Sequence, residues 1–242
     1  MAHATVWYSS TPESLADALL DDAFYAFVCE PVAAPSRQAA LTAYMQAALV
    51  EGQAVGRVVA EAHGAAIWST GDSSEATAAA EASRREGIRA AVGQAGLQRF
   101  DAAVADMSAV SAALPELAGA WYLSILGVAP HVQRTGLGRR LLAPTLAEAD
   151  TARVPCWLET YGHEALPFYA SLGFHPVGGQ PVRTSCVGAH YWILLRRPAD
   201  RTLRTLTPVD LPGGDPSGGR LFVSDAVARG ERWGDAKKRY AK

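Results

Sequence analysis

Val128-Ala129-Pro130-His131-Val132-Gln133-Arg134-Thr135-Gly136-Leu137-Gly138-Arg139-Arg140 is the stretch of sequence that decides the fold. It joins a strongly apolar run to a helical pattern through a loop that contains glycine and is flanked by arginines. Such a loop can turn several backbone N–H groups toward one point, and the following helix adds the positive end of its dipole. The stretch therefore predicts a seat for a pyrophosphate group.

The glycine spacing narrows the kind of phosphate ligand. Gln133-x-x-Gly136-x-Gly138 is shorter than the dinucleotide motif G-x-G-x-x-G and lacks the Gly-Lys-Ser/Thr of a P-loop. Both of these nucleotide-binding motifs are therefore disfavoured. Taken alone, the loop leaves open a simple tight turn with solvated arginines.

The composition is that of a globular protein. The 242 residues include 49% hydrophobic and 19% charged side chains with a net charge of −2, which suits one domain of upper-normal size or one domain plus appendages. Cys29, Cys156 and Cys186 are widely spaced and form no C-x-x-C pair. They suggest neither a disulfide framework nor a zinc site, so we expect no metal and a reducing compartment.

The chain ends and the charge balance bear on location and partners. Residues 1–5 lack the basic region and apolar stretch of a signal peptide, and no run approaches the roughly 18 apolar residues of a membrane span. The near-neutral charge argues against a nucleic-acid surface, although residues 237–242 are locally basic. We expect a cytoplasmic protein whose partners include neither nucleic acid nor membrane.

Hydrophobic periodicity and turn residues predict the elements of the first half. We expect a strand at residues 5–8, helices at about 13–27 and 37–50, a hairpin of strands 55–60 and 65–69, and helices between 72 and 107 punctuated by Gly87, Gly93 and Gly96.

The second half alternates strands and helices. The strands are expected at 121–128, 156–160 and 188–196, with a helix after the glycine loop and another at 163–172 that ends at Gly173. Pro144 should kink the first of these helices or shift its start. The order predicts an α/β (α+β) fold in which a central mixed sheet carries helices on both faces.

Two downstream motifs complete a likeness to a known family. Leu158-Glu159-Thr160 and Leu166-Pro167-Phe168-Tyr169-Ala170-Ser171-Leu172-Gly173-Phe174 follow the glycine loop in an order and at separations that resemble the GCN5-related N-acetyltransferase (GNAT) superfamily. Within it, the chain is most similar to the puromycin N-acetyltransferase branch. The likeness is clearest over residues 121–198, and residues 64–70 resemble the same branch more weakly.

The resemblance implies a domain organisation and an activity. A GNAT domain would span residues 1–198, with a mostly antiparallel sheet and a splayed pair of strands. The chain departs from the branch in length, because the likeness ends near Pro198, and residues 199–242 read as an extension with a linker and then a short helix or a disordered segment. The implied reaction moves an acetyl group from acetyl-coenzyme A to a primary amine of a small molecule, such as an antibiotic. A non-catalytic acyl-coenzyme A binding or sensing module and a protein N-acetyltransferase remain alternatives, as do a monomer and a homodimer.

The resemblance also assigns the residues that bind coenzyme A. The backbone at the end of the strand would pair with the pantetheine arm, and the amides of the loop would hold the pyrophosphate. The residues concerned are Leu126, Gly127, Val128, Gln133, Arg134, Thr135, Gly136, Leu137, Gly138 and Arg139.

Two side chains are candidates for catalysis. Tyr169 matches the tyrosine that family members use as a general acid, and a phenol with a reference pKa of about 10 can protonate a thiolate of similar basicity. Glu159 corresponds to a candidate base, with a purely structural carboxylate as the alternative. His163 is a further titratable group nearby, although such a histidine more often caps a helix. Ala165 departs from the branch, which carries Asn at this place.

The acceptor cleft of the superfamily is bordered by the first helices and by the loop between the last two strands. This points to Asp21, Asp22, Phe24, Tyr25 and Trp68 as residues that border the acceptor, together with residues 181–188. Aromatic walls and carboxylates suit a cationic, partly flat amine. Core packing is the alternative role of Phe24 and Trp68.

Overall fold

The computed structural model describes residues 8–71 and 75–198. Its helices are α1 (Thr11–Leu19), α2 (Ala23–Cys29), α3 (Arg37–Val55), α4 (Glu75–Ala112), α5 (Leu137–Ala152) and α6 (Leu166–Ala170). Its strands are β1 (Arg57–Glu61), β2 (Gly64–Ser69), β3 (Trp121–Val128), β4 (Cys156–Thr160), β5 (His175–Pro176), β6 (Val182–Arg183) and β7 (His190–Arg196). The expected strand at 5–8 falls almost wholly outside the described residues, and the expected extension at 199–242 falls wholly outside them.

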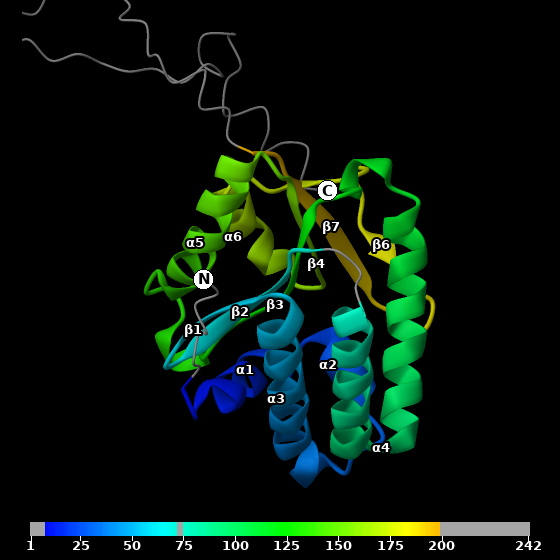
Figure 1. Ribbon diagram of the computed structural model, residues 1–242. Coiled ribbons are helices and arrows are strands. Elements are labelled where there is room, and N and C mark those ends of the chain that lie inside the picture. The colour runs from blue at the N-terminus through cyan, green and yellow to red at the C-terminus, as the bar shows by residue number, and fades with distance from the viewer. Residues whose placement is uncertain (1–7, 72–74, 199–242) are drawn as a thin grey trace, which may run out of the picture. The chain divides into compact units, whose positions relative to one another are not determined.

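A seven-stranded sheet organises this part of the chain. Its order is β1-β2-β3-β4-β7-β5, and β6 pairs with β7. Neighbouring strands run antiparallel except β3 and β4, which run parallel. The helices α1 to α4 lie on one face and α5 and α6 on the other (Figure 1). The predicted mixed sheet with helices on both faces is confirmed.

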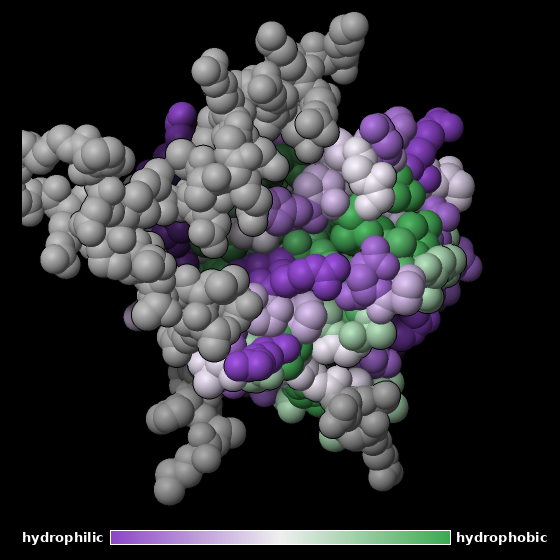
Figure 2. Space-filling model, turned by 90° about the horizontal axis from the view of Figure 1, so that it is seen from above, coloured by the Kyte–Doolittle hydropathy of each residue, from purple (hydrophilic) through white to green (hydrophobic). Residues whose placement is uncertain are grey.

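Each face of the sheet has its own apolar core. The larger cluster joins α1, α2, α3 and α4 to the sheet, and the second joins α5 and the segment around Tyr169 to the other face. A third, smaller cluster lies under the end of α4 and includes Tyr191 and Ile193. On the surface seen in Figure 2, apolar residues show between strongly polar ones, as in folded proteins generally. No described helix is long and apolar enough to cross a membrane.

The predicted helix at 13–27 is two helices, so that expectation is wrong in its continuity. The chain leaves the helical region at Asp22, whose extended backbone (ψ 136°) and side chain start a second helix. The Asp22 carboxylate accepts the Phe24 N–H at 2.9 Å, which makes Asp22 the N-cap of α2. Asp22 and Phe24, at the start of this second helix, both line a cavity beside the sheet.

Of the three glycines expected to punctuate 72–107, Gly93 breaks the helix. Its φ of 74° and ψ of 178° are open to glycine and costly for other residues. Gly87 and Gly96 continue the helix instead and allow close packing. An added Cβ would lie 2.7 Å from the Cβ of Ala47 at the first position and 3.0 Å from the Val28 carbonyl oxygen at the second.

Pro144 lies inside α5 and does not shift the start of the helix, which directly follows Gly136. The helix begins at Leu137 and runs through Pro144 to Ala152. Its end is fixed to the sheet by an ion pair in which Arg196 of β7 donates two hydrogen bonds of 2.7 Å to Asp150. The hairpin of β1 and β2 and the strand at 156–160 form as the sequence predicts.

Candidate functional site

The middle of the sheet opens where β3 and β4 part. The two strands pair over three residues, Trp121–Leu123 against Cys156–Leu158, and further along they do not pair. Beyond that point β3 continues along β2 to Val128, while β4 continues along β7 to Thr160. The backbone edge of β3 that faces β4 is therefore left without a strand partner over its second half.

A bulge in β3 lies at the start of this opening. The register with β2 shifts between Ile67 and Trp68, so Ser124 has no opposite residue. Its hydroxyl donates a hydrogen bond of 3.1 Å to the Ile67 carbonyl. Bulges bend a strand and increase its local twist. The bulge is thus a local cause of the divergence of β3 from β4.

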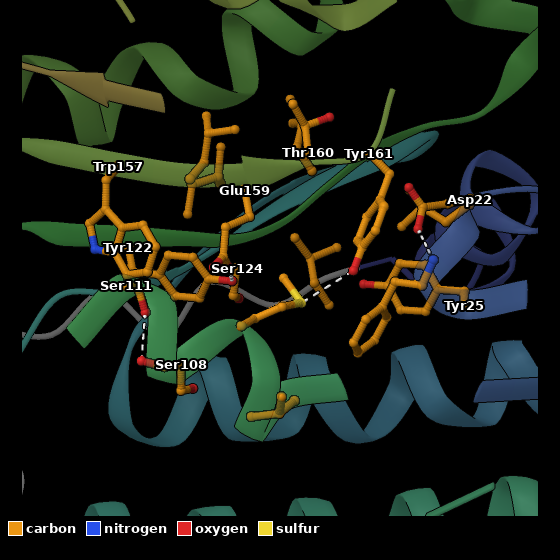
Figure 3. A pocket seen from close by; sticks show the side chains of 18 of the residues that line it. Asp22, Tyr25, Ser108, Ser111, Tyr122, Ser124, Trp157, Glu159, Thr160 and Tyr161 are labelled. Atoms are coloured by element: carbon orange, nitrogen blue, oxygen red, sulfur yellow. Dashed lines mark hydrogen bonds between the residues drawn. The ribbon is translucent and has the colours of Figure 1, made fainter. Parts of the chain in front are cut away.

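A cavity of about 400 Å³ lies at the opening, between the sheet and the helices α1 to α4. The residues labelled in Figure 3 come from β3, β4, the start of α2 and the end of α4. Aromatic rings dominate its wall. These are Phe24, Tyr25, Tyr44, Phe100, Tyr122, Trp157, Tyr161 and Tyr169.

Glu159 lines this cavity and has an unusual acidity. The Tyr122 hydroxyl donates a hydrogen bond of 2.8 Å to its carboxylate. Burial raises the pKa of Glu159 to about 7, and the hydrogen bond from Tyr122 opposes this rise. Burial and the nearby carboxylate raise the pKa of Tyr122 well above its usual range, so Tyr122 stays protonated and donates.

Tyr169 reaches the same cavity from α6. The residue is 8% exposed, and its ring packs against Phe168 and Phe174 at centroid distances of 5.1 and 5.9 Å. Burial raises its pKa above the usual range, and the charge of Asp22 adds to this effect. The phenol therefore keeps its proton at neutral pH. Within the described residues, its hydroxyl has no hydrogen-bond partner.

The glycine loop leads from the end of β3 into α5. Gly136 takes a positive φ of 87° at the N-cap and offers no side chain to the first turn. Among the described residues, no acceptor takes the N–H groups of the first three residues of the helix, Leu137 to Arg139. Uncapped N–H groups at a helix start, next to exposed glycine, can hold a phosphate or another anion.

Some side chains of this loop are already engaged. The side-chain amide of Gln133 donates a hydrogen bond of 3.1 Å to the Val128 carbonyl, and its backbone N–H donates to the Pro130 carbonyl. Both bonds are internal to the loop and stabilise its conformation. Arg139 donates to the Ser171 hydroxyl at 2.8 Å. Arg140 forms two hydrogen bonds of 3.1 Å with Glu61. The donors that remain open are therefore mainly backbone groups.

Two glycines near the loop allow close approach of other parts of the protein. A Cβ on Gly127 would lie 2.5 Å from Leu15, so this glycine lets α1 pack against β3. A Cβ on Gly138 would lie 3.2 Å from the ring of Phe168, which brings α6 against the start of α5.

The structure brings both predicted catalytic residues together with two of the predicted acceptor residues. Tyr169, Glu159, Phe24, Tyr25 and Leu126 line the one cavity. Gly127 and Val128 lie in the part of β3 beyond its pairing with β4.

Three residues that the sequence pointed to lie elsewhere. Trp68 is 1% exposed and packs with Ala66 in the core on the α5 face, because the regular alternation of β2 places both side chains on that face. Asp21 is exposed and does not line the cavity. His163 points to solvent beside Glu164, 3.5 Å away. We therefore leave all three out of the proposed site.

Sequence reasoning missed several residues of the cavity. Tyr122 and Trp157 lie in predicted strands without a role assigned to them, and their ring centroids are 4.3 Å apart. Arg84 lies on α4, outside the recognised motifs. The signal that the sequence does contain is the hydroxyl of Tyr122, a polar group within the apolar run 121–128. Among the described residues, no group of three side chains could hold a metal ion.

Comparison with known proteins places this geometry in a family. Residues 67–192, just over half of the chain, match the sequence model described as the acetyltransferase (GNAT) domain. A solved structure of the histone acetyltransferase HPA2 and related acetyltransferase from Corynebacterium glutamicum is similar at 21% identity, covering 79% of this chain and 91% of that one, with a TM-score of 0.53. It supports the fold.

Two further structures resemble the chain less closely. A putative GNAT acetyltransferase from Desulfovibrio desulfuricans is 27% identical over 35% of this chain, with a TM-score of 0.29, and the match spans 57% of that protein. A mosquito arylalkylamine N-acetyltransferase like 5b is 16% identical, covering 79% of this chain and 97% of that one, with a TM-score of 0.43. On the match of its sequence to the family model and on its fold, this chain belongs to the GNAT acetyltransferase family.

Proposed function

We propose that the protein transfers the acetyl group of acetyl-coenzyme A directly to a primary amine of a small molecule. The observation that carries the proposal is that Glu159 and Tyr169 line the same cavity at the opening between β3 and β4. One group can accept a proton near neutral pH and the other is held protonated. Direct acyl transfer to an amine needs both kinds of group.

The donor would lie along β3 and the start of α5. The open N–H groups of Leu137, Gly138 and Arg139 suit the pyrophosphate, and the unpaired edge of β3 at Leu126 to Val128 suits the amides of the pantetheine arm. Because the loop side chains of Gln133 and Arg140 are engaged within the protein, we assign the pyrophosphate contact to backbone groups. Arg134 and Thr135 are exposed at the rim of this seat.

The chemistry follows from the two titratable groups. The acceptor arrives mainly as an ammonium ion, and the Glu159 carboxylate takes its proton, directly or through water, to leave a neutral amine. The amine attacks the thioester carbonyl, a C–N bond forms and the C–S bond breaks. As the C–S bond breaks, Tyr169 gives its proton to the departing thiolate and the attacking nitrogen loses its second proton to solvent. The proton held by Glu159 then passes by way of solvent to the Tyr169 phenolate, which restores both groups.

The shape of the site favours a small acceptor. A cavity of about 400 Å³ with aromatic walls suits a compact amine that is partly flat. Puromycin is one candidate, because the resemblance of residues 121–198 to that branch includes the Pro-Phe-Tyr segment of α6. A peptide amine would need an open groove.

An acceptor screen tests the proposal. Release of the coenzyme A thiol from acetyl-coenzyme A is followed with a panel of alkylamines, arylalkylamines, aminonucleosides and peptides. We expect turnover with small amines and little with peptides. Binding of acetyl-coenzyme A without turnover for any amine would identify a non-catalytic binding module instead, and turnover confined to peptides would identify a protein acetyltransferase.

A further inference from the structure

A second carboxylate lines the acceptor cavity. Asp22 enters from the start of α2 and Glu159 from β4, and Tyr161 is drawn between them in Figure 3. Burial raises the pKa of Asp22, the N–H groups of Phe24 and Tyr25 lower it, and the negative charge of Glu164 raises it further. The described residues place no cation in an ion pair with either cavity carboxylate.

The structural task of Asp22 does not need its charge. The carboxylate caps α2 through the Phe24 N–H at 2.9 Å. Asparagine caps helices about as well as aspartate, because the side-chain oxygen makes the same bond. The charge at this position, which is costly to bury without a partner, is therefore available for a ligand.

Aromatic side chains surround Asp22. Tyr25 is 8% exposed and lines the cavity, and its hydroxyl has no hydrogen-bond partner among the described residues. Tyr161 lines the same part of the wall and donates to the sulfur of Met107 at 3.4 Å. In Figure 3 the hydroxyls of the two tyrosines point toward each other, and Asp22 lies beside their rings. Ring faces and hydroxyl oxygens next to a carboxylate favour an organic cation.

A positive charge on the cavity wall is already balanced. Arg84 donates to Glu51 at 2.6 Å, and its guanidinium lies 5.9 Å from the ring centre of Tyr44 and 5.8 Å from that of Phe100. Because Glu51 neutralises Arg84, the charges left to a ligand are the two carboxylates. A ligand with a single ammonium group would balance one of them.

We propose that the acceptor is dibasic, with its reacting amine at Glu159 and a second cationic nitrogen seated on Asp22 between Tyr25 and Tyr161. This inference rests on the proposed function and names the class of its substrate. The second nitrogen is an ammonium or a similarly charged group, and an aromatic or alkyl spacer between the two nitrogens contacts the ring walls. Asp22 thus determines specificity and takes no part in the proton transfers.

Matched pairs of acceptors test the inference. One pair is 1,4-bis(aminomethyl)benzene against 4-methylbenzylamine, and another is 1,5-diaminopentane against pentylamine. We expect the full-length protein to favour the dibasic member by about 10- to 100-fold in kcat/KM, the size of effect that one charge-assisted contact produces. Asp22→Asn, which keeps the helix cap, should bring this ratio close to one. Asp21→Asn, which removes the adjacent exposed charge, should keep the wild-type ratio.

Calorimetric binding to the protein saturated with coenzyme A separates this inference from the proposed function. Turnover with equal preference for both members of each pair overturns the dibasic acceptor and leaves the acetyltransferase proposal standing. Tighter binding of the dibasic member that depends on Asp22, without turnover, supports the cation seat and overturns the proposed function. Binding of neither member of either pair overturns the cation seat, while the acceptor screen decides the proposed function.

Discussion

At the scale of single residues, Glu159 is a cavity carboxyl whose protonation state changes near neutral pH. Burial stabilises its protonated form, while the hydrogen bond from Tyr122 at 2.8 Å stabilises the carboxylate. A pKa of about 7 suits a base, because the group is ionised often enough to accept a proton and basic enough to hold it. Tyr122 keeps its own proton, so it can donate the hydrogen bond that stabilises the Glu159 carboxylate.

The pH dependence of kcat/KM tests this assignment. A base works when it is ionised, so kcat/KM for the acceptor should rise with pH and level off above a midpoint of about 7. Glu159→Gln removes the titrating group and should lower kcat/KM by roughly 100-fold and abolish this acidic limb. The measurement is a profile from acid to mildly alkaline pH for both proteins. An acidic limb that survives in Glu159→Gln would assign it to another group.

Tyr169 carries a separate prediction. We expect Tyr169→Phe to lower kcat by roughly 10-fold to 10⁴-fold while the Kd for acetyl-coenzyme A stays close to wild type, because the ring still packs and only the acid is lost. Tyr191→Phe is the matched control, since its buried hydroxyl has no partner among the described residues and lies off the cavity. An unchanged kcat in Tyr169→Phe would remove Tyr169 from the acid role.

At the scale of elements, the regular strands could be predicted and the break at Asp22 could not. The strand at 156–160 and the hairpin carry short apolar runs bounded by turn residues, and they form as expected. Residues 13–27 carry continuous helical periodicity, so the sequence gives little sign that Asp22 caps a new helix. Leu123 and Ile125 are two residues apart yet lie in the cores on opposite faces, because the bulge at Ser124 stands between them, and this bulge arises in the pairing of β3 with the distant β2. Local patterns do not contain such pairings.

The glycine loop provides the prediction at this scale. Gly136 and Gly119 both take positive φ, 87° and 70°, and an added Cβ at either position would meet nothing within 4 Å. The substitutions Gly136→Ala and Gly119→Ala should therefore each cost about 1–2 kcal/mol of unfolding free energy through backbone strain. Only Gly136→Ala should also weaken acetyl-coenzyme A binding, by about 10-fold, because it disturbs the start of α5.

Denaturant unfolding and calorimetry measure the two quantities separately. Gly119 precedes β3 and lies outside the loop, so it reports the strain alone. Equal losses of affinity in the two variants would mean that the effect of Gly136→Ala comes from general destabilisation. Such a result would withdraw the loop from the donor site.

At the scale of the whole molecule, the sheet separates the two proposed binding regions. The donor loop belongs to the face covered by α5 and α6, while the acceptor cavity lies among α1 to α4 on the other face. The regions meet where β3 and β4 part, because there the sheet has no backbone pairing to close it. The family motifs include the residues of the first region. The second also takes part of its wall from α4, whose residues the motifs do not cover.

This separation predicts how substitutions combine. Gly136 and Glu159 share no contact among the described residues, so the free-energy effects of Gly136→Ala and Glu159→Gln on kcat/KM should add to within about 0.5 kcal/mol. Tyr122→Phe removes the donor of one hydrogen bond and Glu159→Gln removes the charge of its acceptor, so the two effects should deviate from additivity by about 0.5–3 kcal/mol. The two cycles, measured at low concentrations of both substrates, share the Glu159→Gln variant. Strong coupling in the first cycle would mean that the donor loop and the acceptor cavity act as one unit, and the sheet would then transmit changes between the regions that it separates.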